Sequence, residues 1–322
     1  MYRIQTIFLA AIFFISCNNK SAEKKITTTE TDSAVTVATL PDVEDVDMDS
    51  IINSEPVITS TSPSAMLRFN LPKGKTYAFT MEMDMNQEQG GQTVGSSMLY
   101  NYQMAVTGSS NNNKTLKVTY GKMEMNMNMG GQKLSFSSED KSLDKNNPMQ
   151  MVSRMFAAMK GKSFSMKVSP DGEILSVEGF DKLGEEMVND MGVPEQQKDM
   201  FLQGFQSRFN SDMIRETFSQ GFNFLPNKEV KPGDKWTKKM NIPIGETDAE
   251  INTTYTVKSI SKNKVTIDAL SNYPNNTGGL GDNLSRMIVN AETGMIIESI
   301  GETRQQGSNK VIARNKITAR EL

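Results

Sequence analysis

Beyond residue 66, apolar and polar residues alternate in short runs, the pattern of strands that bury one face. The clearest runs lie at 81–85 and 123–129, where every second residue is methionine. Before Gly121 the apolar positions 116, 118 and 120 have the opposite parity. We therefore predict mainly antiparallel strands, with a β-bulge at Gly121 that changes which side chains face the core.

Two stretches have helical periodicity instead. One helix is predicted to begin at an Asn147 N-cap and to end at Gly161. A second block extends from about residue 180 to 220. We expect this block to be divided into two or three short helices by Gly184, Pro194 and Gly204. We expect the second block to cover a sheet, with a partner-binding face as the alternative.

The strand pattern occurs twice. Gly74-Lys75-Thr76-Tyr77 precedes the first methionine run, and Gly233-Asp234-Lys235-Trp236 precedes apolar residues at 240, 242 and 244. Two turns, at Gly172 and Gly294, are each followed by another glycine seven residues later, as in two equivalent hairpins. These matches predict one duplicated β unit.

The predicted fold class is α+β, mainly antiparallel β, in which the duplicated unit forms a curved sheet or half-open barrel with a helical insertion. Repeat one covers about residues 66–179, the helical insertion about 180–225, and repeat two about 226–322. Together they form a single β-rich domain, residues 66–322.

The first 16 residues have the features of a secretory signal. Arg3 is followed by an apolar run from 7 to 15, too short to span a bilayer, and Ser16 stands directly before Cys17. This sequence resembles the lipobox of bacterial lipoproteins, in which the cysteine is acylated and becomes the first residue after cleavage. Because Cys17 is the single cysteine of the chain, we predict a signal peptide at 1–16 and lipidation of Cys17.

Residues 17–65 are rich in Ser, Thr and acidic residues and contain no aromatic residue, which predicts a disordered acidic tether. Its net charge is −6, whereas the remaining domain is nearly neutral. The segments around Ser33 and Ser50 resemble the Asp-Ser/Thr-aliphatic sites that some diderm bacteria O-glycosylate, so both serines are candidate glycosylation sites.

Composition excludes several kinds of chemistry. The chain has no histidine and one cysteine, so it lacks an imidazole base, a His-ligated zinc site, a Cys-His pair and an internal disulfide. The near-neutral domain gives no support for nucleic-acid binding. We expect no catalytic residue, no cofactor and no metal site, and a protein that is not an enzyme. A hydrolase that uses a pair of carboxylates remains an alternative.

The 24 methionines admit three interpretations. They fill a core, they line an adaptable surface for an acyl chain or hydrophobic partner, or their thioethers bind Cu(I). In the repeat alignment, isoleucines at 242 and 244 take the positions of Met83 and Met85. Isoleucine can replace a buried side chain but not a thioether ligand, so the repeat favours burial over copper. The candidate ligand-facing residues are Met81, Met83, Met85, Met123, Met125, Met127 and Met129.

The lipobox, the polar tether, the duplicated strands and the entry from Pro226 to Trp236 resemble a family of uncharacterised lipoproteins of diderm bacteria, classed only as a domain of unknown function. The resemblance implies a cell-envelope lipoprotein and supplies no catalytic residue. A looser similarity of shape is to the half-open barrels of lipid carriers. We expect a non-catalytic binding or scaffolding module on the outer membrane, facing the periplasm. Its expected partners are membrane lipid, through the Cys17 anchor, and a hydrophobic ligand or an envelope protein.

Overall fold

The computed structural model describes Met48 and residues 63–89, 92–129, 131–141, 143–144, 147, 150–207, 209–244, 247–274, 280–305 and 310–322. Cys17, Ser33 and Ser50 lie outside the described residues, as do the predicted signal peptide and most of the predicted tether. Met48, within that predicted tether, is only 3% exposed. The side chain of this residue is therefore covered.

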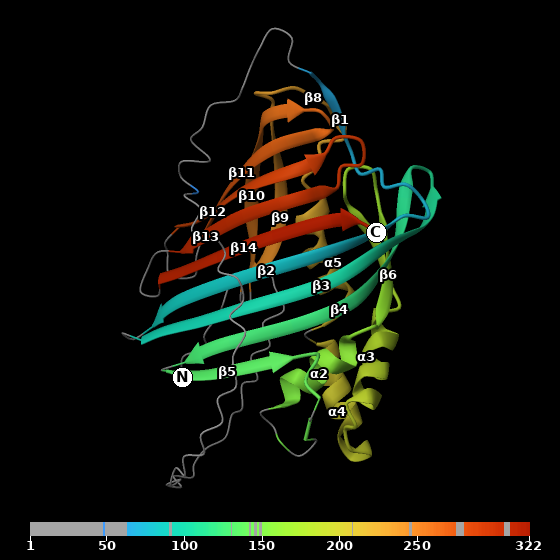
Figure 1. Cartoon of the computed structure of the whole chain (residues 1–322), viewed down its shortest axis with the longest axis vertical. Coiled ribbons are helices and arrows are strands. Elements are labelled where there is room, and N and C mark those ends of the chain that lie inside the picture. The colour runs from blue at the N-terminus through green and yellow to red at the C-terminus, as the bar shows by residue number, and fades with distance from the viewer. Residues whose placement is uncertain are drawn as a thin grey trace.

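One antiparallel sheet of twelve strands dominates the described part of the chain (Figure 1). Its strands are β2 (Thr76–Gln89), β3 (Gln92–Ser110), β4 (Asn113–Met129), β5 (Gln132–Ser137), β6 (Ser163–Val168), β7 (Ile174–Glu178), β9 (Lys235–Ile244), β10 (Thr247–Ser261), β11 (Lys264–Pro274), β12 (Leu280–Asn290), β13 (Ile296–Gln305) and β14 (Lys310–Glu321). Their order is β7-β6-β4-β3-β2-β14-β13-β12-β11-β10-β9, with β5 paired to β4. No described pairing joins β7 to β9, so the sheet stays open.

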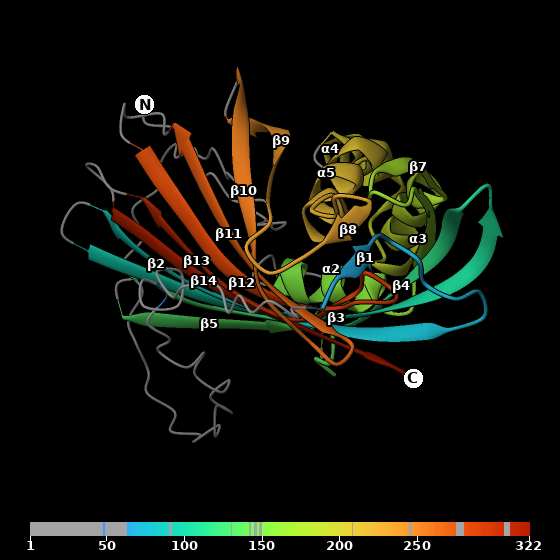
Figure 2. The ribbon, with the colours of Figure 1, turned by 90° about the horizontal axis from the view of Figure 1, so that it is seen from above.

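Four helices occur in the described residues: α2 (Met151–Met159), α3 (Phe180–Asp190), α4 (Glu195–Gln206) and α5 (Ser211–Phe222). Figure 2 shows them all on one side of the sheet, which we call the inner face, and β10 turning up toward that same side. This arrangement confirms the predicted α+β class with an open, mainly antiparallel sheet. No helix of the described chain is long and apolar enough to cross a membrane.

The two halves of the sheet have the same local strand order. In the first half, neighbouring strands of the sheet follow one another in the chain as β2, β3, β4, β6 and β7. In the second half they do so as β9, β10, β11, β12 and β13, and β14 joins the halves by pairing with β13 and β2. The Gly74 N–H donates to the Val106 carbonyl at 2.8 Å, as the Gly233 N–H donates to the Val257 carbonyl at 2.8 Å. A separate short pair, β1 (Ala65–Leu67) with β8 (Lys228–Val230), lies at the start of each half.

The predicted turn and bulge glycines are confirmed. Gly172 and Gly294 have φ of +85° and +68° in the β6–β7 and β12–β13 hairpins. At Gly121 the β3–β4 register shifts, because Tyr102 lies opposite Tyr120 whereas Tyr100 lies opposite Met123. A Cβ on Gly121 would stand 3.0 Å from the Asn101 carbonyl oxygen. The bulge therefore depends on a residue without a side chain.

Two details of the helix predictions are wrong. The first helix begins at Met151 rather than near Asn147, since the Gln150 N–H bonds to the Asn147 carbonyl and closes a separate turn before it. Gly184 and Gly204 lie inside α3 and α4 instead of ending them. A Cβ on Gly184 would meet the Phe205 ring at 3.0 Å, so this glycine allows α3 and α4 to pack closely.

The breaks in the helical block fall elsewhere. α3 ends before Gly192, whose φ is +65°, and Pro194 is the N-cap of α4, as the proline suggested. Asn210 caps α5, where its side-chain oxygen accepts a hydrogen bond from the Met213 N–H at 2.9 Å. Left-handed glycines outside the helices and the capping residues Pro194 and Asn210 therefore set these boundaries.

Candidate functional site

The methionines of β2 and β4 lie on the same face of the sheet, on either side of β3. Met98 is directly opposite both Met83 and Met125. The neighbouring rows are Met81–Tyr100–Met123 and Met85–Ser96–Met127. Residues directly opposite one another in an antiparallel sheet project to the same face, so these rows form one surface, which we call the methionine face.

The methionine face grades from core to partly open surface. The most buried members are Met123, Met125, Met98 and Met85, with exposures of 1%, 2%, 3% and 5%. Met81, Met83 and Met127 are half-buried, and Met129 is 49% exposed. Of the seven predicted ligand-facing methionines, Met85, Met123 and Met125 are therefore core, and the other four are partly or largely accessible.

Neighbouring strands extend the methionine face. On β14, Ile317 lies opposite Met81 and Ala313 opposite Met85. On β5, Phe136 lies opposite Met125 and Leu134 opposite Met127. The sequence analysis missed these residues together with Met98 and Tyr100. The alternation of apolar residues at 98, 100, 102 and 104 of β3 is the signal that could have found the last two.

The row that contains Met85 becomes polar in the second half of the sheet, whereas the row that contains Met81 continues past Ser299 to the buried apolar residues Met287, Ile267 and Val257. Thr253 and Ser271 are 2.7 Å apart at their hydroxyls, and the Asn283 amide donates to the Thr303 hydroxyl at 2.7 Å. Thr253, Ser271 and Thr303 are each buried. Their hydrogen bonds are satisfied within the sheet, so this one row offers no apolar surface beyond β14.

Three tyrosines continue the methionine face toward the helices. Tyr100 and Tyr102 lie two residues apart on β3, and Tyr120 is opposite Tyr102 on β4. All three are half-buried, yet burial raises the pKa of each hydroxyl, and Tyr100 and Tyr102 raise the pKa of Tyr120 further. The three side chains pack against the hydrophobic core of the inner face.

Aromatic rings pack on two of these tyrosines, Tyr102 and Tyr120. The Tyr102 ring stacks on Phe79 with centroids 4.9 Å apart and meets Phe218 of α5 edge-on at 5.7 Å. Phe164 of β6 lies 5.8 Å from Tyr120 and 5.7 Å from Phe218. α5 therefore packs through Phe218 against the inner face of β2, β3 and β4 at these tyrosines.

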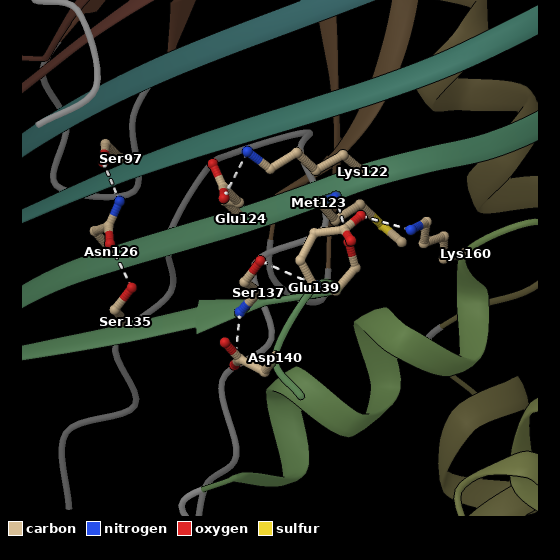
Figure 3. A network of polar contacts seen from close by, with 11 residues as sticks. Ser97, Lys122, Met123, Glu124, Asn126, Ser135, Ser137, Glu139, Asp140 and Lys160 are labelled. Atoms are coloured by element: carbon tan, nitrogen blue, oxygen red, sulfur yellow. Dashed lines mark hydrogen bonds and ion pairs between the residues drawn. The ribbon is translucent and has the colours of Figure 1, made fainter. Parts of the chain in front are cut away.

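The opposite, outer face of these strands is polar, as alternation requires. Figure 3 shows the Asn126 side chain between Ser97 and Ser135, at 3.4 and 2.8 Å, and the Lys122–Glu124 ion pair at 2.8 Å. These polar side chains therefore hydrogen-bond or pair with one another at the surface. They leave the methionine face as the apolar side of this part of the sheet.

The buried carboxylates of the sheet lie on the outer face as well. Glu302, 3% exposed, binds both Arg304 and Arg314, the latter at 2.8 Å. Asp268, 4% exposed, accepts two hydrogen bonds from Arg286, at 2.7 and 2.8 Å, and lies 3.4 Å from Lys258. Each carboxylate is held by two basic side chains. The described residues contain no group of three or more His, Cys, Asp or Glu that could hold a metal ion.

Comparison with solved structures finds distant likenesses. A structure of lipid–protein interactions in lipovitellin matches at 13% identity and a TM-score of 0.42, over 77% of this chain and 25% of the other. An outer membrane channel from Pseudomonas putida F1 matches at 8% identity and a TM-score of 0.28, over 78% and 97%. DynF of Micromonospora chersina matches at 6% identity and a TM-score of 0.18, over 83% and 89%. At these scores the likenesses do not extend to a shared function, and the chain spans a quarter of the lipovitellin chain.

No curated protein matches the sequence. A family model does match, over residues 111–311, from the turn before β4 into β14. This region includes most of the sheet, all four described helices and the β4 part of the methionine face. The chain therefore belongs to the family of unknown function DUF6263.

Proposed function

We propose that this protein is a lipid-anchored binding protein of the bacterial cell envelope that holds a hydrophobic or acyl ligand on the methionine face. The observation that carries the proposal is the mostly apolar surface across β5, β4, β3, β2 and β14, on which four of the seven predicted methionines are only partly buried or exposed. Flexible, polarisable methionine side chains adapt to ligands of varied shape. Ligand sites are mostly apolar and have a few polar groups, which the tyrosines beside the methionine face would supply.

The anchor of this proposal is Cys17. Two or three acyl chains on one cysteine hold a protein on a membrane, at about 0.8 kcal/mol per buried methylene. The acidic segment after it, with its net charge of −6, is repelled by anionic head groups and would keep the domain away from the bilayer. We place the protein on the outer membrane, facing the periplasm, with Ser33 and Ser50 as candidate O-glycosylation sites.

A non-catalytic role agrees with the outer-face carboxylates, since Glu302 and Asp268 are occupied by basic partners. The matching strand order and the Gly74 and Gly233 hydrogen bonds support an origin by duplication. In this proposal, the first copy supplies the ligand surface, and the second copy continues the sheet with one polar row beside a buried apolar row.

The proposal is tested by ligand binding to the full chain carrying Cys17→Ser, expressed with export and purified from the envelope. Native mass spectrometry is expected to show co-purified lipid or binding of added acyl ligands. Met127→Asp places a charge on the half-buried part of the methionine face and should weaken binding at least tenfold. Met200→Asp, at a residue of α4 that is 71% exposed, is the matched control. A protein that is empty and ignores acyl ligands contradicts the proposal.

One observation favours a second candidate, Cu(I) binding. Met83, Met98 and Met125 lie opposite one another on three adjacent strands, which brings three thioethers together. Replacing all three with leucine keeps an apolar surface of similar volume and removes the sulfurs. Stoichiometric Cu(I) binding that disappears in this variant would favour copper, whereas unchanged acyl binding would favour the lipid ligand.

A further inference from the structure

We propose that Met48 and the acidic residues around it, segment 42–49, dock on the outer face of β11 to β14 and cover Leu284. The segment then acts as a strap that holds the end of the predicted tether on the sheet. The docking surface lies opposite the methionine face, so the strap requires no ligand there.

The outer face of the sheet is buried unevenly. Among the described outward residues of β2, β3 and β4 none is buried, and the outward Leu99 is half-buried. On β11, β12 and β13, the outward residues Asp268, Leu284 and Glu302 are only 4%, 7% and 3% exposed. The four described helices lie on the inner side (Figure 2), so they do not cover these residues. Another group must therefore cover this part of the outer face.

Leu284 shows where the cover lies. It stands in one outward row between Leu270 of β11 and Glu302 of β13. Leu270 is 40% exposed, whereas Leu284 is 7% exposed. Two leucines side by side on one face differ this much when a further group lies over one of them. The cover therefore lies over β12 and β13.

Met48 supplies an occupant for this surface. It is the only residue described before residue 63, and its side chain is 3% exposed. A methionine in a polar segment loses so much exposure by packing against apolar side chains, and its flexible thioether adapts to an irregular surface. Leu284 is an apolar side chain of the outer face that needs such a cover.

Charge complementarity favours the same occupant. Segment 42–49 contains five acidic residues and no basic residue. The described outward side chains of β11 to β14 include six basic and four acidic ones, a net charge of +2. On β2 the outward charged side chains are all acidic, at 82, 84 and 88. An acidic segment is therefore attracted to β11–β14 and repelled by β2.

Docking shortens the flexible part of the tether. With the Cys17 anchor of the proposed function, residues 18–41 would remain between the anchor and the strap. A coil of this length spans about 27 Å, compared with about 38 Å for the whole of 18–65. The strap would thus hold the outer face of the second half toward the anchor.

Methyl NMR of the full chain carrying Cys17→Ser tests the contact directly. With methionine and leucine methyl groups labelled, the Met48 methyl is expected to show NOEs to the Leu284 methyls. NOEs from Met48 only to inner-face methyls such as that of Met81, or none to the sheet, overturn the inference. NOEs between differently labelled chains in a mixed sample would assign the face to a second copy and overturn it as well.

Proteolysis supplies a second measurement with an internal reference. A glutamate-specific protease cuts after Glu44, within the strap, and after Glu30, outside it. Met48→Ser removes the apolar contact and should raise cleavage after Glu44 relative to Glu30 about tenfold. Val37→Ser, at an apolar residue outside the strap, is the matched control and should leave this ratio unchanged. A ratio that Met48→Ser does not alter, or that both variants alter equally, contradicts docking but leaves the proposed ligand on the inner face untouched.

Discussion

The close approach of α5 to the β6–β7 turn leads to a sharp prediction at Gly172. The φ of this residue is +85°, and a Cβ would stand 1.9 Å from the Phe222 carbonyl oxygen and 2.4 Å from the carbonyl carbon. Alanine in the left-handed region costs about 1–2 kcal/mol, and the backbone shift needed to relieve such an overlap costs about 1–3 kcal/mol more. Gly172→Ala should therefore lower the free energy of unfolding by about 3 kcal/mol.

Gly74 is the matched control, because its φ is +87° and nothing lies within 4 Å of its Cβ position. Gly74→Ala should lose only the backbone contribution, about 1 kcal/mol. Urea unfolding of the Cys17→Ser protein and the two variants measures the difference. Equal losses in the two variants would refute the argument that α5 is locked to this turn.

Three further predictions concern the core, the outer face and alkaline pH. Met125→Ala should lower the free energy of unfolding by about 3 kcal/mol through the cavity it leaves, while Met125→Leu should lower it by less than about 1.5 kcal/mol. Similar losses in the two variants would contradict this, because they would show that neighbouring side chains fill the cavity. Glu302→Ala should lose about 3 kcal/mol, since it leaves Arg304 and Arg314 without their shared buried carboxylate, and a neutral result in urea unfolding would contradict this. Burial raises the pKa of Tyr255 to about 12, so its contribution is complete below its unfolded pKa of about 10 and declines as the pH rises toward 12. Tyr255→Phe should remove that part of the decline, roughly 2 kcal/mol, in unfolding measured at a series of alkaline pH values.

Local chemistry made several elements predictable. The positive φ at Gly172 and Gly294, the bulge at Gly121 and the common face of the methionine runs all follow from glycine geometry and the two-residue period of strands. The glycines inside helices show where local reasoning fails. Gly184 is a packing contact with Phe205, and that contact depends on how two helices meet rather than on the residues beside it.

The ligand surface was predictable only in part, because its completion depends on pairing between distant segments. Met98 and Tyr100 join the methionine face through the β2–β3–β4 register, and Ile317 joins it because the C-terminal β14 pairs with β2. The convergence of Tyr102 with Tyr120 likewise appears only when both strands are placed. Alternation along one strand specifies a face, but it does not specify which other strands share it.

Methyl NMR on the Cys17→Ser protein with labelled methionine methyl groups tests the central claim most directly. Addition of an acyl ligand is predicted to shift the signals of Met81, Met83 and Met127, which line the accessible part of the methionine face. The signals of Met66 and Met200, which are 50% and 71% exposed elsewhere, should remain unchanged. Saturating ligand that shifts only these exposed methionines, or none of the five, would contradict the account.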